Sequence, residues 1–369
     1  MKHIGLVLAF LALAGCVDRS ASPTVPEALE IGSNYRVFAA STRLPEGPDS
    51  FGYRRSDQLR YLNLTVSIPP NREPGTLRFG YGNPNPQRNF TMANREIFPD
   101  AAAFRADLRH TMNAHPLKNK EVTIFVHGFN ATQSETAFRA AQLAHDIDMP
   151  GEMMVYSWPS RGNPLAYAYD SDSALFARDG LEQTLREVKA AGARRILLVA
   201  HSMGSLLTME TLRQLDIKDP GWAGRNLGGV ILISPDLDVD VFRKQMSLIS
   251  NPPRPFVVFV SAKDKILNLS ARLRGTHNTP RLGNRSSAQL VSDLPIEIVD
   301  TTEFSDTAGS AHFVPATSPA LLAMLQGARQ MNRTFRQDET SFESMIVGVS
   351  VERGPDSEII LRPLSDSSR

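Results

Sequence analysis

From residue 121 onward, short runs of apolar residues alternate with longer segments in which apolar residues recur at helical spacing. The short runs are continuously apolar, which is typical of strands buried on both faces of a parallel sheet. Strands are therefore expected at 122–128, 152–160, 194–200, 229–235, 256–264 and 296–302. Helices are expected between them, at 133–147, 173–191 and 203–215. This alternation predicts an α/β fold with helices on both faces of the sheet.

The N-terminal third shows a different pattern. Three short segments with alternating apolar and polar residues, at 35–42, 59–69 and 75–82, are separated by turns rich in proline and glycine. Such segments indicate antiparallel strands, which we place at one edge of the sheet. Beyond about residue 335 the chain is polar with one weak strand pattern. We therefore expect one α/β domain over residues 32–335 and a polar C-terminal tail over 336–369.

The first residues, MKHIGLVLAFLALAGC, have a basic start, an apolar stretch and then small residues. This is the layout of a secretory signal, and the stretch is too short to span a membrane. Its end, LAGC, resembles the lipobox of bacterial lipoproteins. The resemblance implies cleavage after a signal peptide of residues 1–15 and lipidation of Cys16. The alternative is an ordinary signal peptide that ends near a cysteine.

A lipidated Cys16 would anchor the protein to a membrane through its acyl chains. Residues 16–31 are rich in serine, proline and alanine, and we expect them to form a tether. Val17 follows the cysteine instead of the aspartate linked to inner-membrane retention, which favours the periplasmic side of the outer membrane. Cys16 is the only cysteine, so no disulfide is expected. The expected location is the bacterial cell envelope.

Composition limits the possible partners. The chain is 41% hydrophobic and 21% charged, with a formal net charge of +1. This balance gives no electrostatic argument for binding nucleic acid. The sequence contains no metal-type Cys/His cluster, so we expect no metal and no other cofactor. The oligomeric state stays open.

The segment VAHSMGS contains the candidate nucleophile, Ser202, between an apolar strand and a helix. A sharp strand-to-helix turn raises the serine hydroxyl above the sheet, and the residues two before and two after must be small. Ala200 and Gly204 satisfy this requirement. Met203 opens the helix, so its backbone N–H points toward the same space as the serine oxygen. The alternative is a serine that only caps the helix.

Other polar residues follow neighbouring strands, and carboxyl ends of parallel strands meet at one edge of the sheet. The segment HGFN follows the first of these strands, and the Phe129 N–H is a candidate oxyanion donor beside that of Met203. His127 is expected to bond the loop backbone, and His201 to pack in the turn. Of the eight histidines, His312 lies in the loop after the last strand, where a base could reach Ser202.

Two aspartates compete for the acid that would orient His312. Asp236 follows one strand in SPDLD, and Asp264 follows the next in SAKD. Either gives the chain order Ser, Asp, His. We favour Asp264, because its strand lies nearer to His312. Asp236 and the weaker candidate Asp238 would then shape the pocket or cap the helix that begins near Val239.

Together these motifs resemble the α/β-hydrolase superfamily. More specifically, FVHGFN, YSWPS, VAHSMGS, SPDLD and VSAKDKIL resemble a bacterial esterase/lipase-like branch, over roughly residues 35–325. The resemblance implies an α/β-hydrolase fold with a triad of Ser202, Asp264 and His312, and oxyanion donors at Phe129 and Met203. The sequence departs from the family's usual pattern after His312, where a small residue and then an aromatic are typical, because the aromatic Phe313 follows the histidine directly. The stretch YSWPSRGNPLAYAYD is either a lid or packing.

The expected activity is that of a serine hydrolase acting on a small-molecule or lipid ester through an acyl-enzyme. The same triad also catalyses amide cleavage and acyl transfer, so the motifs do not name the substrate. A different class also stays open: a non-catalytic envelope lipoprotein that uses a hydrolase shell to bind a partner.

Overall fold

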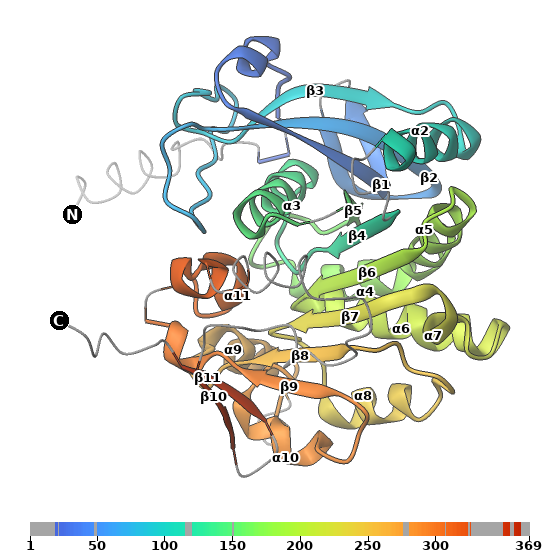
Figure 1. Cartoon of the computed structure of the whole chain (residues 1–369), viewed down its shortest axis with the longest axis vertical. Helices are drawn as coiled ribbons and strands as arrows, with labels where there is room; N and C mark the ends of the chain where they lie inside the picture. Colours follow the sequence, from blue (N-terminus) through green and yellow to red (C-terminus); the bar gives the residue numbers. More distant parts are fainter. Residues whose placement is uncertain are drawn as a thin grey trace, which may run out of the picture.

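A computed structural model describes residues 19–20, 22–47, 50–114, 120–149, 151–275, 280–306, 308–323, 325, 350–354 and 358–362. Within these residues, eleven strands form one sheet in the order β10-β11-β9-β8-β7-β6-β4-β5-β1-β2-β3 (Figure 1). The strands are β1 Ser33–Gly47, β2 Ser50–Ile68, β3 Thr91–Ile97, β4 Glu121–Val126, β5 Glu152–Ser157, β6 Arg195–His201, β7 Leu227–Ile233, β8 Phe256–Val260, β9 Glu297–Asp300, β10 Ser350–Arg353 and β11 Ile359–Arg362. All six strands expected after residue 121 are present.

The sheet is mostly parallel, as predicted. Neighbouring strands from β9 to β5 pair in parallel, and β5 continues in parallel to β1. The N-terminal edge is antiparallel, with β2 between β1 and β3. The strand expected at 75–82 is wrong, because that segment forms only one isolated bridge, between Phe79 and Phe90. Gly75 and Gly82 both have positive φ angles, which turn the chain away from an extended course.

The helices are α2 Ala101–Ala114, α3 Gln133–Ile147, α4 Tyr167–Phe176, α5 Arg178–Ala190, α6 Met203–Lys218, α7 Trp222–Asn226, α8 Val239–Met246, α9 Lys265–Leu273, α10 Ala288–Val291 and α11 Val314–Thr317, with short 3-10 helices η1 Pro26–Glu30, η2 Arg285–Ser287 and η3 Thr302–Phe304. The single helix expected at 173–191 is two helices, α4 and α5, which meet at Ala177.

The two faces of the sheet form two separate hydrophobic cores. In β4, Ile124 and Val126 belong to the core that includes α2, α5, α6 and α8. Phe125, between them in sequence, belongs to the core that includes α3 and α11. Figure 1 shows these helix groups on opposite sides of the sheet. Because successive residues of a strand point to opposite faces, a continuously apolar strand is buried on both sides. The loops at the carboxyl ends of the strands thus rest on a rigid platform.

Both ends of the expected domain need correction. The described residues before 32 do not form a free tether. Val25 N–H donates to the Met92 carbonyl at 2.8 Å, and the buried Ala28 accepts from the Ser67 hydroxyl at 2.8 Å. At the other end, β11 pairs in parallel with β9, and β10 pairs with β11, so part of the expected tail completes the sheet. By joining the edge of the sheet, β10 and β11 obtain partners for their backbone hydrogen-bonding groups. Cys16 and the signal peptide lie outside the described residues.

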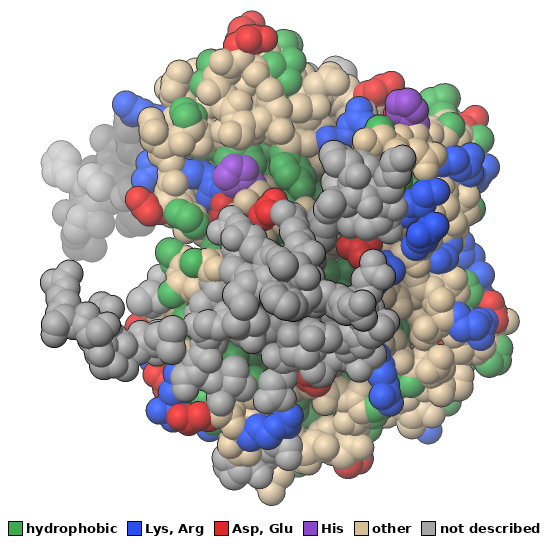
Figure 2. Space-filling model, viewed as in Figure 1, with side chains coloured by type: hydrophobic (Ala, Val, Ile, Leu, Met, Phe, Trp, Pro, Cys, Tyr) green, Lys and Arg blue, Asp and Glu red, His purple; other side chains and the backbone are tan. Residues whose placement is uncertain are grey.

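Basic and acidic side chains are interspersed over the described part of the face in Figure 2, in keeping with the net charge of +1. Among the helices of the described chain, none combines the length and apolar character that crossing a membrane would need.

Candidate active site

Ser202 occupies the turn between β6 and α6, and the backbone there is strained. Its φ is 53° and its ψ is −122°, in the left-handed half of φ space that residues with a side chain rarely adopt. Two backbone bonds hold this conformation: Ser202 N–H donates to the Ile233 carbonyl at 3.0 Å, and the Ser202 carbonyl accepts from Asp236 N–H at 3.2 Å. The side chain makes no capping bond to α6. Helix capping therefore does not explain this serine.

Glycines allow the close approach of β4 to the turn. A Cβ on Gly204 would lie 2.4 Å from the His127 carbonyl oxygen and 2.6 Å from that of Val126. A Cβ on Gly128 would lie 2.9 Å from the Ser202 Cβ. Gly204 is therefore needed because the end of β4 passes directly over it. The atoms that a Cβ at this position would meet first belong to Val126 and His127, and not to Ala200 on the other side of the turn. The same packing places the loop after β4 against Ser202.

His312 and Asp264 meet at this edge, although 48 positions separate them. His312 Nδ1 lies 2.7 Å from Asp264 Oδ2, and the aspartate is fully buried. The other carboxylate oxygen, Oδ1, accepts from the N–H groups of Ile266 and Leu267 and so caps α9. A capping carboxylate cannot rotate freely, so Asp264 is fixed in orientation. Such an aspartate can select the histidine tautomer with its proton on Nδ1, which leaves Nε2 free to accept a proton.

The histidine also lies next to the turn that contains Ser202. His201 Nε2 lies 3.2 Å from the His312 carbonyl oxygen, and the two rings are 4.8 Å apart. Ser202 Oγ has no hydrogen-bond partner among the described residues. Nucleophile-to-base bonds are often long without substrate and shorten when substrate binds. The residue after the histidine, Phe313, stacks on His201 at 3.9 Å and thereby fixes the loop.

Asp236, the alternative acid, has different partners. It accepts hydrogen bonds from the Tyr167 and Ser270 hydroxyls, both at 2.6 Å. It also forms a buried ion pair with Arg281, whose Nε lies 3.0 Å from Oδ1. Asp238 caps α8 by accepting from the N–H groups of its first turn, as expected. Only Asp264 among the three candidate acids is hydrogen-bonded to His312 in this structure.

The loop after β4 presents an unpaired backbone donor near Ser202. The Phe129 N–H has no acceptor among the described residues. Met203 is the first residue of α6, and the N–H groups of a helix's first turn have no partner within the helix. The Phe129 ring packs on Tyr167, with centroids 5.4 Å apart. Two such N–H groups beside a serine can bind the oxygen of a tetrahedral intermediate.

His127 and His201 are structural in this geometry. His127 is stacked on Trp158 at 4.7 Å, and its ring nitrogens contact the carbonyls of Gly128 and Trp158. Burial, with the nearby Arg43 charge, lowers the pKa of His127 to about 3. Burial likewise holds the pKa of His201 well below its usual range. Both side chains are therefore neutral at neutral pH.

Two supporting residues escaped the sequence analysis. Arg43, at the end of the expected edge strand, is 1% exposed and donates to the carbonyls of Ala131 and Ser160, both at 2.8 Å. Burial lowers its pKa to about 10, so it stays charged at neutral pH. Asp170 accepts from Asn130 N–H at 3.2 Å. Arg43 lies outside the motifs, and Asp170 is the last residue of the stretch YSWPSRGNPLAYAYD, where nothing but its charge distinguishes it.

In the stretch expected to be a lid or packing, the aromatic residues pack on the fold, whereas residues 161–165 are mostly exposed, with Leu165 93% exposed. Trp158 is fully buried and donates from its indole N–H to the His127 carbonyl at 2.8 Å. Tyr169 bonds the Tyr53 carbonyl at 2.9 Å. Tyr167 bonds Asp236, as described above.

Among the described residues, no group of three or more His, Cys, Asp or Glu side chains has the arrangement of a metal site.

The sheet order, the turn at Ser202 and the adjacent polar loops define an α/β-hydrolase. The chain belongs to the family described as "Alpha/beta hydrolase of unknown function (DUF900)", whose model matches residues 100–329. No curated protein matches the chain.

Solved structures of low similarity include three hydrolases. A hydrolase described as YdeN-like, from Pectobacterium atrosepticum, is 16% identical over 57% of this chain and 87% of its own, with a TM-score of 0.31. An ester-hydrolase from the metagenome of Lake Arreo is 11% identical over 88% of this chain and 94% of its own, with a TM-score of 0.34. An esterase from Pyrobaculum calidifontis is 12% identical over 89% of both chains, with a TM-score of 0.29.

Proposed function

We propose that this protein is a serine hydrolase that cleaves carboxylic esters. Ser202 Oγ attacks the ester carbonyl, and His312 Nε2 accepts the hydroxyl proton. His312 then passes that proton to the departing alcohol, which leaves an acyl group on Ser202. Water, activated by the same nitrogen, releases the acid and restores the serine. Asp264 orients the ring and stabilises its positive charge, and the N–H groups of Phe129 and Met203 bind the anionic oxygen.

The observation that supports this proposal best is the buried contact between His312 Nδ1 and Asp264 Oδ2. A carboxylate that both caps a helix and bonds a histidine beside a strained serine has a clear use in proton transfer. A shell that only binds a partner has no need of it. Amide cleavage and acyl transfer use the same groups, and ester cleavage is the default because many enzymes with this turn are esterases.

Labelling with a fluorophosphonate probe tests the proposal. We expect the folded protein to be labelled, Ser202→Ala to lose the label, and Ser205→Ala to keep it. Ser205 is a matched control, because it is also buried and lies on the first turn of α6. Absence of label on the folded wild type would leave the binding-shell alternative standing. Three assays then separate ester cleavage, amide cleavage and acyl transfer. They measure turnover of a short p-nitrophenyl ester, turnover of the matching anilide, and transfer of the acyl group from the ester to an added alcohol.

We further propose that Cys16 is lipidated and anchors the enzyme on the periplasmic side of the outer membrane, where it meets a lipid or small-molecule ester. The support is the LAGC sequence after a basic and apolar leader. Cys16→Ser should move the protein from the membrane fraction to the soluble fraction and abolish incorporation of an alkyne-labelled fatty acid. Unchanged fractionation with no incorporated fatty acid would contradict the anchor.

A further inference from the structure

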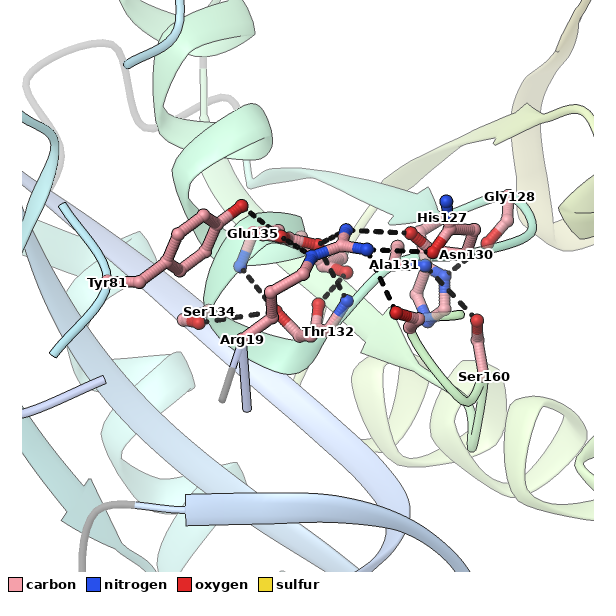
Figure 3. A network of polar contacts seen from close by, with 12 residues as sticks. Arg19, Tyr81, His127, Gly128, Asn130, Ala131, Thr132, Ser134, Glu135 and Ser160 are labelled. Carbon is pink, nitrogen blue, oxygen red and sulfur yellow. Dashed lines mark hydrogen bonds and ion pairs between the residues drawn. The ribbon is translucent and has the colours of Figure 1, made fainter. Parts of the chain in front are cut away.

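Arg19 binds the loop that follows β4. Its guanidinium donates to the Asn130 side-chain oxygen at 2.8 Å and to the Asn130 carbonyl at 3.1 Å. It donates to the Gly162 carbonyl at 2.9 Å, and it makes two bonds to Glu135, at 2.9 and 2.8 Å. Figure 3 shows the guanidinium between Glu135 and the 127–131 loop. A residue that the sequence analysis placed in a tether thus joins the loops after β4 and β5.

The bound loop includes a residue in an unfavourable backbone conformation. Asn130 has a φ of 59°, in the left-handed region. Its carbonyl and side chain bond Arg19, and its N–H bonds Asp170. The residue immediately before it is Phe129, whose N–H is the proposed oxyanion donor. That N–H lies in the peptide between Gly128 and Phe129, so a displacement of the Asn130 backbone would shift the adjoining Phe129 and move the N–H with it.

Glu135 gives Arg19 a fixed, charged partner. The carboxylate is buried and forms a capping box with Thr132 at the start of α3. Tyr81 also donates to it, from the other side in Figure 3. Burial alone would lower the pKa of Arg19, but the hydrogen bond and the charge of Glu135 raise that pKa above its ordinary value. Charge-assisted, two-bond pairs of this kind are stronger and more directional than neutral hydrogen bonds.

We propose that Arg19 is a positioning residue of the active site, which holds the Phe129 N–H toward the oxyanion by fixing the backbone of Asn130. This inference rests on the proposed function. Arg19 stands three residues after Cys16, a span of at most about 10 Å in an extended chain. The segment next to the proposed lipid anchor therefore completes the active-site loop, and an enzyme cut after residue 31 lacks part of its catalytic support.

The test compares Arg19→Gln and Arg19→Lys with Arg95→Gln as the matched control. Arg95 donates to the Ser22 carbonyl at 3.3 Å, so it bonds the same N-terminal segment from strand β3. Deleting one oxyanion donor lowers kcat by about 10²–10³-fold. For Arg19→Gln we expect a fall in kcat of about 10-fold to 10²-fold, because the donor is displaced rather than deleted. KM for a short p-nitrophenyl ester should change less than about 3-fold.

Two further readouts separate positioning from a loss of stability. A trifluoromethyl ketone forms a hemiketal with the serine, whose oxyanion occupies the proposed site. Its inhibition constant should rise in step with the loss of kcat/KM. Added guanidinium ion should restore part of the activity of Arg19→Ala, and equal urea should not. Arg19→Lys should lie between wild type and Arg19→Gln, and the melting temperatures show whether each variant is folded.

Folded Arg19 variants with wild-type kcat and inhibitor affinity would overturn the inference. An equal loss in Arg95→Gln would also overturn it, because general loosening of the segment would then explain the effect. Either result leaves ester turnover by the wild type intact. A folded wild type with no turnover and no label refutes the proposed function instead, so the two failures are distinguishable.

Discussion

Asparagine substitutions at Asp264 and Asp236 separate two roles for buried carboxylates at the same edge of the sheet. In Asp264→Asn, the amide oxygen can keep the bonds to Ile266 and Leu267, which leaves the NH₂ group facing His312 Nδ1. That nitrogen must then accept, so the ring proton moves to Nε2, where it blocks uptake of the serine proton. In the Ser-His-Asp template this change lowers kcat by about 10⁴-fold.

A 10⁴-fold loss corresponds to about 5.4 kcal/mol in the activation barrier. The free energy of unfolding should change by only about 1 kcal/mol, because the cap on α9 is retained. Asp236→Asn should behave in the opposite way. It leaves Arg281, only 2% exposed, without its counter-charge. Breaking a buried pair costs about 3–5 kcal/mol of stability, whereas kcat per folded molecule should stay within about 10-fold of wild type.

The assay is turnover of a short p-nitrophenyl ester, with urea unfolding of the same samples to measure the folded fraction. Asp264→Glu is a useful third variant, because it keeps the carboxylate charge and changes only the length of the side chain. Near-normal kcat in folded Asp264→Asn, together with collapse in folded Asp236→Asn, would refute the assignment and make Asp236 the orienting acid.

Two other predictions concern packing and pH. Gly204→Ala should destabilise the fold by about 1–3 kcal/mol and impair turnover, because its Cβ meets the Val126 and His127 carbonyls; Ala200→Gly should cost about 0.5–1 kcal/mol with activity intact. Urea unfolding of both variants checks this, and a Gly204→Ala variant with the stability and turnover of the wild type would contradict it. The unfolded chain binds a proton on His127 below pH 6.5, whereas the folded pKa is about 3. Stability should therefore fall as pH drops through this window, by up to about 1.4 kcal/mol per pH unit from His127. A stability that is flat from pH 7 to well below 6.5 would contradict this.

Much of the fold follows from local patterns. Continuously apolar runs predict the parallel strands, because burial on both faces leaves no polar position in them. The carboxyl ends of such strands lie at one edge, so the sequence pattern predicts that Ser202, Asp264 and His312 lie near each other. The prediction of a strand at 75–82 was wrong, because the pattern of apolar residues does not show that the glycines at both ends turn the chain.

The sequence by itself determined the fold class, the order of the candidate catalytic residues and the small residues around Ser202. These depend on side-chain periodicity and on chain order. Only the tertiary structure decided which aspartate bonds His312, and that Arg19 and Arg43 hold the loop after β4. Arg19 and Asn130 are 111 positions apart, and such a pair leaves no trace in either local pattern. The hydrogen-bonding needs of a buried backbone loop are met by whichever charges the fold brings close, and only the assembled fold shows which they are.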